Sequence, residues 1–237
     1  MHGRDFKALL FDVFGTVVDW RSSVIREGEA VGAHFGIDID WTAFADAWRG
    51  LYQPSMEAVR CGQRPWCRLD DLHRESLQVL LDKFAVIGLN EAQVEELNRA
   101  WHRLDPWPDT LPGLTRLRRK YTLATLSNGN TALLVNMAKR AGLPWDAILG
   151  AETAGYYKPQ PEAYLRTADQ LGLVPAQCVM VAAHNDDLRT AQSLGFGTAF
   201  ICRPTEYGPE QKEDLIAEGD WDVVADSLVE LADRMRA

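Results

Sequence analysis

The second half of the chain alternates short apolar runs with segments of helical length, and this alternation limits the fold more than any other feature. The apolar runs have the length and composition of buried strands, whereas the segments between them show the apolar spacing of amphipathic helices. Strands that alternate with helices form right-handed βαβ units and a parallel sheet. Strands are expected at 122–126, 147–149, 178–182, 198–201 and 222–224, and helices at 131–141, 161–171, 188–195 and 227–235.

One more strand is expected near the N-terminus, separated from the others by a long helical block. Residues 8–12 form an apolar run that ends in an acid, and Gly15 follows in the next loop. From about 22 to 104 the apolar spacing is helical, and no segment has the pattern of a strand. Three prolines within 105–112 then break the helical pattern and predict a stiff return segment.

Together these elements predict an α/β fold, a doubly wound parallel sheet with a helical cap inserted after the first strand. The Rossmann-like core is expected to comprise residues 1–19 and 106–237, and the cap residues 20–105. In open sheets of this kind, ligands bind beyond the carboxyl ends of the strands. Polar residues at strand ends are therefore the first candidates for function.

Composition narrows the range of partners. The formal net charge of −9 repels nucleic acid and anionic membranes, so neither is expected as a partner. The four cysteines form no CxxC pair and are expected to be free thiols in a reducing compartment. The first residues have the pattern of a strand and not of a signal peptide, and no apolar stretch approaches the ~20 residues that span a bilayer. We expect a cytoplasmic protein.

Side chains capable of chemistry follow four of the predicted strands. Because the carboxyl ends of parallel strands meet at one edge of a sheet, these side chains are expected to surround one site. They are Asp12, Phe14 and Thr16 after the first strand, Ser127 and Asn128 after the second, Lys158 after the third, and His184, Asn185 and Asp187 after the fourth.

These four segments resemble the four motifs of the haloacid dehalogenase superfamily. F-D-V-F-G-T resembles the first motif and places its aspartate nucleophile at Asp12, while L-S-N-G resembles the second. Y-K-P-Q-P-E-A-Y resembles the third motif, and V-A-A-H-N-D-D-L the fourth. One such motif alone is weak, whereas four in order at strand ends are specific. The resemblance covers the whole chain, including the helical cap.

Two departures separate the chain from phosphatases, which make up most of that superfamily. Phosphatases carry a second aspartate two residues after the nucleophile to protonate a basic leaving group, and here that position is Phe14. They also bind Mg²⁺ through an acidic fourth motif, and this chain has Ala183 at the position of the first acid of that motif. A halide leaves without a proton, so both losses favour a 2-haloacid dehalogenase that uses no metal or other cofactor.

The cap and the third motif resemble the same branch. Trp48-Arg49 is similar to a tryptophan-arginine pair in the cap of L-2-haloacid dehalogenases, and Tyr164 also matches those enzymes. The resemblance implies that Asp12 attacks the α-carbon of a 2-haloacid and forms an ester. It also implies that Lys158 keeps Asp12 ionised and that Arg49 receives the departing halide.

The remaining roles follow from the same resemblance. Asn128 would assist at the halide, and Ser127 with the backbone N–H of Phe14 would hold the substrate carboxylate, while Thr16 shapes the turn. Asp187, assisted by Asn185 or His184, would activate the water that hydrolyses the ester to a 2-hydroxy acid. The resemblance also suggests a homodimer.

His184 is the least settled of these residues. The usual dehalogenase has serine and asparagine where this chain has Ala182 and His184. The imidazole could hold the water, act as a base or donate to the leaving group, and these alternatives stay open. The changed donors extend the expected substrates to small fluorinated acids such as fluoroacetate. A phosphatase with a degraded acid site and a non-catalytic binding protein are the alternative functions.

Overall fold

A parallel five-stranded sheet forms the centre of the molecule. The computed structural model describes residues 5–237, so residues 1–4 of the expected core segment lie outside the described part. The strand order is β4 (Thr122–Thr125), β1 (Ala8–Phe11), β5 (Cys178–Ala182), β6 (Gly197–Ile201) and β7 (Val223–Ala225). Every pair of neighbouring strands is parallel, which confirms the expected α/β class.

Helices cover both faces of the sheet, so the sheet is doubly wound as expected. Side chains of a strand alternate between faces. Leu9 and Phe11 belong to the apolar cluster that contains α6 (Thr110–Leu117), α7 (Thr131–Ala141) and α11 (Leu228–Arg234). Ala8 and Leu10 belong to the opposite cluster, with α9 (Pro161–Gln170) and α10 (Asn185–Ser193). The short helix α8 (Ala151–Ala154) and the 3₁₀ turn η2 (Pro175–Gln177) complete these layers.

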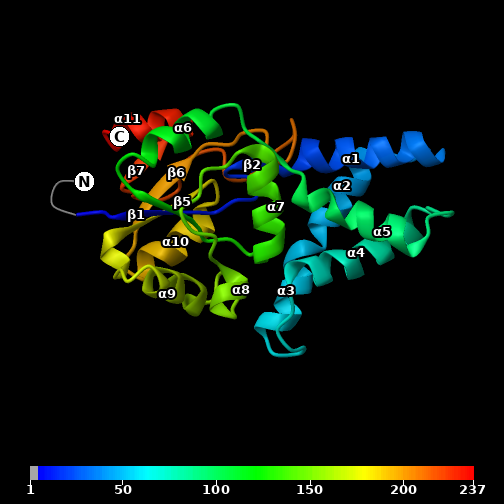
Figure 1. Cartoon of the computed structure of the whole chain (residues 1–237), viewed down its shortest axis with the longest axis horizontal. Helices are drawn as coiled ribbons and strands as arrows, with labels where there is room; N and C mark the ends of the chain where they lie inside the picture. Colours follow the sequence, from blue (N-terminus) through cyan, green and yellow to red (C-terminus); the bar gives the residue numbers. More distant parts are fainter. Residues whose placement is uncertain (1–4) are drawn as a thin grey trace.

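A block of helices follows the first strand and lies to one side of the sheet (Figure 1). It comprises α1 (Trp20–Phe35), α2 (Trp41–Gly50), α3 (Tyr52–Arg60), α4 (Leu69–Lys83), α5 (Glu91–Asn98) and the 3₁₀ turn η1 (Arg99–His102). The block enters through β2 (Val18–Asp19) and leaves through β3 (Asp105–Pro106), and these two strands pair antiparallel. Its two ends therefore meet. None of the helices within residues 5–237 is long and apolar enough to cross a membrane.

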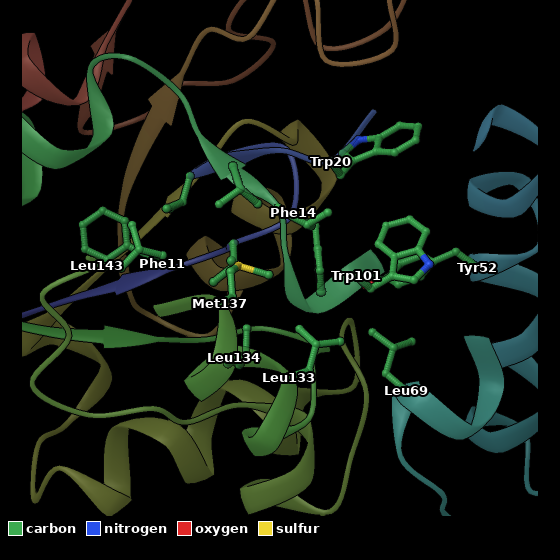
Figure 2. Packing of buried hydrophobic residues seen from close by; sticks show 14 of the residues in the cluster. Phe11, Phe14, Trp20, Tyr52, Leu69, Trp101, Leu133, Leu134, Met137 and Leu143 are labelled. Carbon is green, nitrogen blue, oxygen red and sulfur yellow. The ribbon is translucent and has the colours of Figure 1, made fainter. Parts of the chain in front are cut away.

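Aromatic packing joins the helical block to the carboxyl end of β1. Phe14 lies edge-on to Trp101, with ring centroids 6.0 Å apart, and Trp101 stacks on Trp20 at 6.1 Å. Tyr52 also lies edge-on to Phe14, with ring centroids 6.3 Å apart. Figure 2 shows these rings in one apolar cluster that continues from the sheet into the helices. The helices are thereby held over the strand ends.

The structure differs from two sequence expectations about local elements. The expected strand at 147–149 is reduced to one isolated bridge at Ala147. Side chains take over hydrogen bonds that a strand ladder would make: Asp146 accepts from the N–H of Leu123, and Thr125 bonds both backbone groups of Leu149. The expected stiff segment through Pro112 is also wrong in its second half, where α6 begins. Pro112 is the third residue of that helix, and its missing N–H costs nothing in a first turn.

Candidate active site

The carboxyl ends of the strands open into a cleft of about 1100 Å³ that faces the helical block. Strand ends supply the floor of this cleft, and α2 and α3 supply the opposite wall. Of the sequence-predicted residues, the cleft is lined by Asp12, Phe14, Arg49, Asn128, Lys158, Tyr164, His184 and Asp187. The structure thus brings most of the expected site together in one place.

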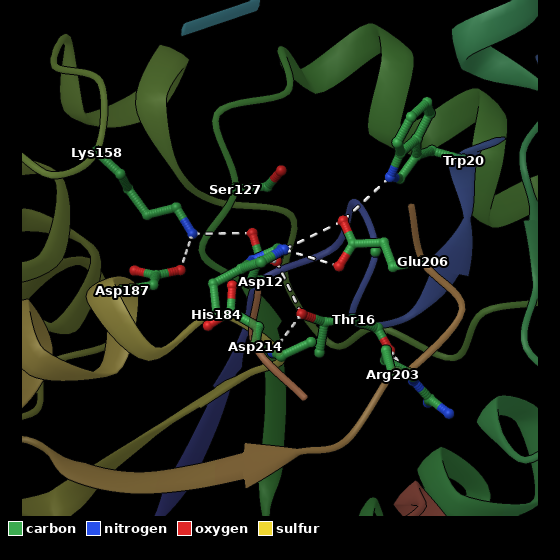
Figure 3. Close-up of polar contacts among 12 residues, drawn as sticks. Asp12, Thr16, Trp20, Ser127, Lys158, His184, Asp187, Arg203, Glu206 and Asp214 are labelled. Carbon is green, nitrogen blue, oxygen red and sulfur yellow. Dashed lines mark hydrogen bonds and ion pairs between the residues drawn. The ribbon is translucent and has the colours of Figure 1, made fainter. Parts of the chain in front are cut away.

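Asp12 lies at the bottom of the cleft, immediately after β1, with 6% of its surface exposed. Its Oδ1 is 2.9 Å from Lys158 Nζ. Its Oδ2 accepts a hydrogen bond from Thr16 Oγ1 at 2.8 Å and lies 3.2 Å from His184 Nδ1. Thr16 Oγ1 in turn accepts from the N–H of Ala183, so the hydroxyl has a fixed direction. Figure 3 shows these donors converging on the carboxylate.

The donors around Asp12 determine its charge. Burial on its own would raise the pKa of Asp12, but Lys158 and His184 outweigh burial and hold it well below the usual value of 3.8. Burial would lower the pKa of Lys158, yet Asp12 and Asp187 raise it above its usual value. Asp12 is therefore a buried carboxylate throughout the neutral range, with Lys158 as a permanent cation beside it.

Lys158 also connects Asp12 to Asp187. Its ammonium group forms an ion pair with Asp187 Oδ2, while Tyr164 OH donates to Asp187 Oδ1 at 2.5 Å. Asn128 Oδ1 accepts from the backbone N–H of Lys158 at 2.8 Å and so fixes the loop between α8 and α9. Two carboxylates are thereby held on either side of one cation, and both face the cleft.

Arg49 reaches into the cleft from α2. Its guanidinium carbon lies 4.2 Å from the centroid of the Tyr52 ring and 5.4 Å from that of Trp20. Burial would lower the pKa of Arg49, but Tyr207, Tyr52 and Glu206 raise it. Within residues 5–237 its buried Nη1 has no hydrogen-bond partner. A guanidinium with one buried, unpaired nitrogen in an aromatic-walled pocket is suited to an anion.

Three expected residues do not line the cleft. Ser127 is fully buried, and its Oγ accepts from the N–H of Gly129 at 3.1 Å. Thr16 is fully buried and donates its hydroxyl hydrogen bond to Asp12 Oδ2. Asn185 is buried under the loop of residues 214–221, where its side chain bonds Asp214, Glu218, Trp221 and the backbone oxygen of Ile216.

Glu206 and Tyr207 belong to the site but were missed by sequence reasoning. Both lie in the loop after β6, and Tyr207 lines the cleft. Glu206 is 1% exposed, and its carboxylate lies 2.9 Å from His184 Nε2. A Cβ at Gly15 would lie 2.1 Å from Glu206 Oε1, so the glycine of the first motif leaves the space that Glu206 fills. The loop has no periodic pattern that could have marked either residue.

The donor set does not fit the Mg²⁺ ion used by phosphatases of this superfamily. Among residues 5–237 no group of three or more His, Cys, Asp or Glu side chains is arranged to hold a metal ion. Lys158 already occupies the position between Asp12 and Asp187, and His184 contacts the other oxygen of Asp12. A divalent cation at Asp12 would meet two cationic groups there.

The fold and the site place the chain among α/β enzymes whose active site lies at the carboxyl ends of parallel strands. A family model described as haloacid dehalogenase-like hydrolase matches residues 6–195. The chain is 30% identical to (S)-2-haloacid dehalogenase 4A of Burkholderia cepacia over 222 residues, which cover 85% of this chain and 86% of the relative.

Solved structures are similar over the full chain. A defluorinating L-2-haloacid dehalogenase superposes with a TM-score of 0.96 at 48% identity, covering 99% of this chain and 97% of that one. A second L-2-haloacid dehalogenase superposes with a TM-score of 0.95 at 49% identity, covering 98% and 99%. The chain belongs to the haloacid dehalogenase-like hydrolases. The expected resemblance, to the family and to its 2-haloacid dehalogenase branch, is confirmed.

Proposed function

We propose that this enzyme hydrolyses short 2-haloalkanoic acids to 2-hydroxy acids through an ester on Asp12. The observation that carries the proposal is the buried Asp12 carboxylate, which Lys158 and His184 keep ionised. Two residues after it, Phe14 stands where a phosphatase has its second acid. The similarity to 2-haloacid dehalogenases supports the substrate class.

In the first step one oxygen of Asp12 attacks the α-carbon, and the carbon–halogen bond breaks with its electron pair leaving on the halide. Arg49 meets the halide, because its Nη1 is buried without a partner and can stabilise charge that develops in the transition state. Asn128 assists Arg49 at the halide, and the backbone N–H of Phe14 holds the substrate carboxylate. Ser127 supports the loop of Asn128 through its bond to Gly129.

In the second step a water attacks the carbonyl carbon of the ester. Asp187 accepts one proton of the water and returns it to the alkoxide oxygen of the leaving 2-hydroxy acid. The other proton of the water is released to solvent, so that Asp12 returns as a carboxylate. Tyr164 and Lys158 orient Asp187 for this task. Burial would lower the pKa of His184, but Glu206 and Asp12 raise it well above 6.5. His184 therefore acts as a donor and not as the base at neutral pH.

The unpaired Nη1 of Arg49 favours leaving groups that need strong hydrogen bonds. Fluoride is the most basic of the halides and accepts the strongest hydrogen bonds, so a site rich in cationic donors is suited to it. We include fluoroacetate among the substrates for this reason, and the likeness to a defluorinating enzyme supports it.

We also infer that residues 20–105 form a cap domain over a core of 1–19 and 106–237. The pairing of β2 with β3 at the two junctions supports this division.

Product analysis tests the reaction. The protein is incubated with L-2-chloropropionate, fluoroacetate and p-nitrophenyl phosphate, each with and without EDTA, and halide and phosphate are measured. We expect halide release that persists in EDTA. Phosphate release that requires Mg²⁺ would overturn the proposal in favour of a phosphatase, and the absence of any product would favour a binding protein.

A trapping experiment tests the ester. In Asp187→Asn, hydrolysis slows and the peptide that contains Asp12 should gain the mass of the carboxyalkyl group that the substrate leaves on the Asp12 oxygen. Asp169→Asn, an exposed substitution on α9, is the matched control and should show no increment. An Asp187→Asn protein that still turns over but never carries the increment would rule out covalent catalysis.

A further inference from the structure

Glu206 is a buried carboxylate that the proposed reaction does not use directly. Its side chain is fully buried, and it accepts a hydrogen bond from Trp20 Nε1 at 3.0 Å. The only salt-bridge partner that residues 5–237 give it is His184, whose Nε2 lies 3.1 and 2.9 Å from its two oxygens. Burying an unpaired carboxylate costs free energy, so the contact with His184 compensates the buried charge of Glu206.

The geometry fixes the protonation of the ring between them. His184 Nδ1 faces Asp12 Oδ2, and His184 Nε2 faces Glu206, so both ring nitrogens meet carboxylate oxygens. A neutral imidazole has one N–H and one lone pair, and its lone pair would then point at an anion. Only the doubly protonated ring satisfies both neighbours. Figure 3 shows this line from Asp12 through His184 to Glu206 and Trp20.

We propose that Glu206 is a positioning residue of this site, which holds His184 as an imidazolium with its Nδ1–H directed at Asp12 Oδ2. The loop that carries Glu206 is anchored for this task. Arg203 donates to the backbone oxygen of Thr16 at 3.0 Å and forms a bidentate pair with Asp109 at 2.8 and 2.9 Å. The absence of a side chain at Gly15 leaves the space for the carboxylate.

Other charged groups surround His184 and set the balance between its neutral and charged forms. Lys158 and Arg49 are cations that oppose a charge on the ring, whereas Asp12, Asp187 and Glu206 favour it. The phenol of Tyr207 lies next to Glu206 in the chain and has a raised pKa, because burial disfavours its anion. Of the favourable groups, only Asp12 and Glu206 contact the ring itself.

The consequence for catalysis rests on the proposed function. When water attacks the ester, negative charge develops on the oxygen that was the carbonyl of Asp12. The Thr16 hydroxyl and the His184 Nδ1–H both contact Oδ2, which makes them donors for that oxyanion if Oδ1 carries the ester. Glu206 contacts no reacting atom and acts through His184.

The sign of the pH dependence follows. With Glu206 in place, the pKa of His184 is raised, and the imidazolium persists as pH rises through neutrality. Without the Glu206 charge, the pKa of His184 falls toward its ordinary value of about 6.5. The donor would then be lost between about pH 6 and 8. An imidazole with the ordinary pKa of about 6.5 is only about 3% charged at pH 8. The charged fraction of His184 rings would then be about 30-fold lower than in a protein whose rings are all charged.

Glu206→Gln tests the proposal, because glutamine keeps the shape but removes the charge. Glu210→Gln, an exposed change in the same loop, is the control. The His184 ring is followed by NMR with isotope-labelled histidine, its signals being identified with His184→Gln, and halide release from L-2-chloropropionate is measured from pH 5.5 to 8.5. We expect His184 to stay charged in the wild type and the control, and to titrate near neutrality in Glu206→Gln, with a parallel loss of turnover.

The two readouts separate the possible failures. A His184 ring that titrates in Glu206→Gln as it does in the wild type would overturn the proposal. A neutral ring in the wild type at pH 7 would also overturn it, whether or not Glu206→Gln folds. If the ring behaves as expected but no protein releases halide, the positioning role stands and the proposed function fails.

Discussion

Replacing His184 while keeping Glu206 should cost more stability than replacing both. In His184→Gln the buried Glu206 loses its salt-bridge partner and keeps the Trp20 N–H. Removing one partner of a buried ion pair typically costs about 3–5 kcal/mol. We expect about 3 kcal/mol, the lower end, because the indole N–H and the nearby charge of Arg49 remain. In His184→Gln/Glu206→Gln no charge is stranded, and a cost of about 1 kcal/mol is expected, similar to one ordinary buried hydrogen bond.

Urea unfolding followed by tryptophan fluorescence measures the four free energies of the cycle. The double variant should be about 2 kcal/mol more stable than His184→Gln at pH 8, with Glu210→Gln unchanged. At pH 5 the difference should shrink, because a stranded carboxylate in the folded protein takes up a proton that the unfolded chain binds less well. A double variant that is less stable than His184→Gln, or additive losses, would refute the assignment of the Glu206–His184 contact as an ion pair.

Three further outcomes are expected. Arg49→Met should lower halide release about 10²- to 10³-fold, because a charged donor to the leaving group is lost; steady-state kinetics measure this, and an unchanged kcat would contradict the halide role. Tyr164→Phe removes a 2.5 Å hydrogen bond to Asp187 and should slow ester hydrolysis about tenfold or more. The ester should then accumulate in mass spectra, whereas a slower first step without accumulation would count against the role of Asp187. Asn185→Ala should lower the free energy of unfolding by about 2–3 kcal/mol, since one buried and three part-buried hydrogen bonds are lost, and leave KM unchanged; a raised KM would restore Asn185 as a substrate ligand.

The fold was predictable from the sequence where local patterns determine structure. Apolar runs such as 178–182 and the helix at 131–141 report their own burial, and strands that alternate with helices have few topologies to choose from. Pairing between distant residues leaves no such trace. The ladder of β2 with β3 joins Val18 to Pro106, and nothing in either dipeptide predicts its partner.

The same distinction applies to the site. Asp12, Lys158 and Asp187 follow strands in the sequence, so a rule about strand ends finds them. The rule is less reliable within a helix, where successive side chains differ in direction by about 100°. His184 precedes α10 and faces Asp12, while Asn185 begins α10 and faces the loop of residues 214–221. Glu206 lies in an irregular loop, and its role becomes visible only when the fold brings it next to His184.

The pairing of β2 with β3 has a consequence for how this protein can change. Trp107 Nε1 donates to the backbone oxygen of Gly15 at 2.7 Å, and Thr110 Oγ1 donates to that of Val17 at 2.7 Å. The exit of the helical block is thus tied to the loop that follows the nucleophile, close to its entry. An insert whose ends meet can lengthen, shorten or be exchanged with little strain on the sheet that receives it. Substrate preference can therefore evolve in the helices over the cleft while the geometry around Asp12 stays constant.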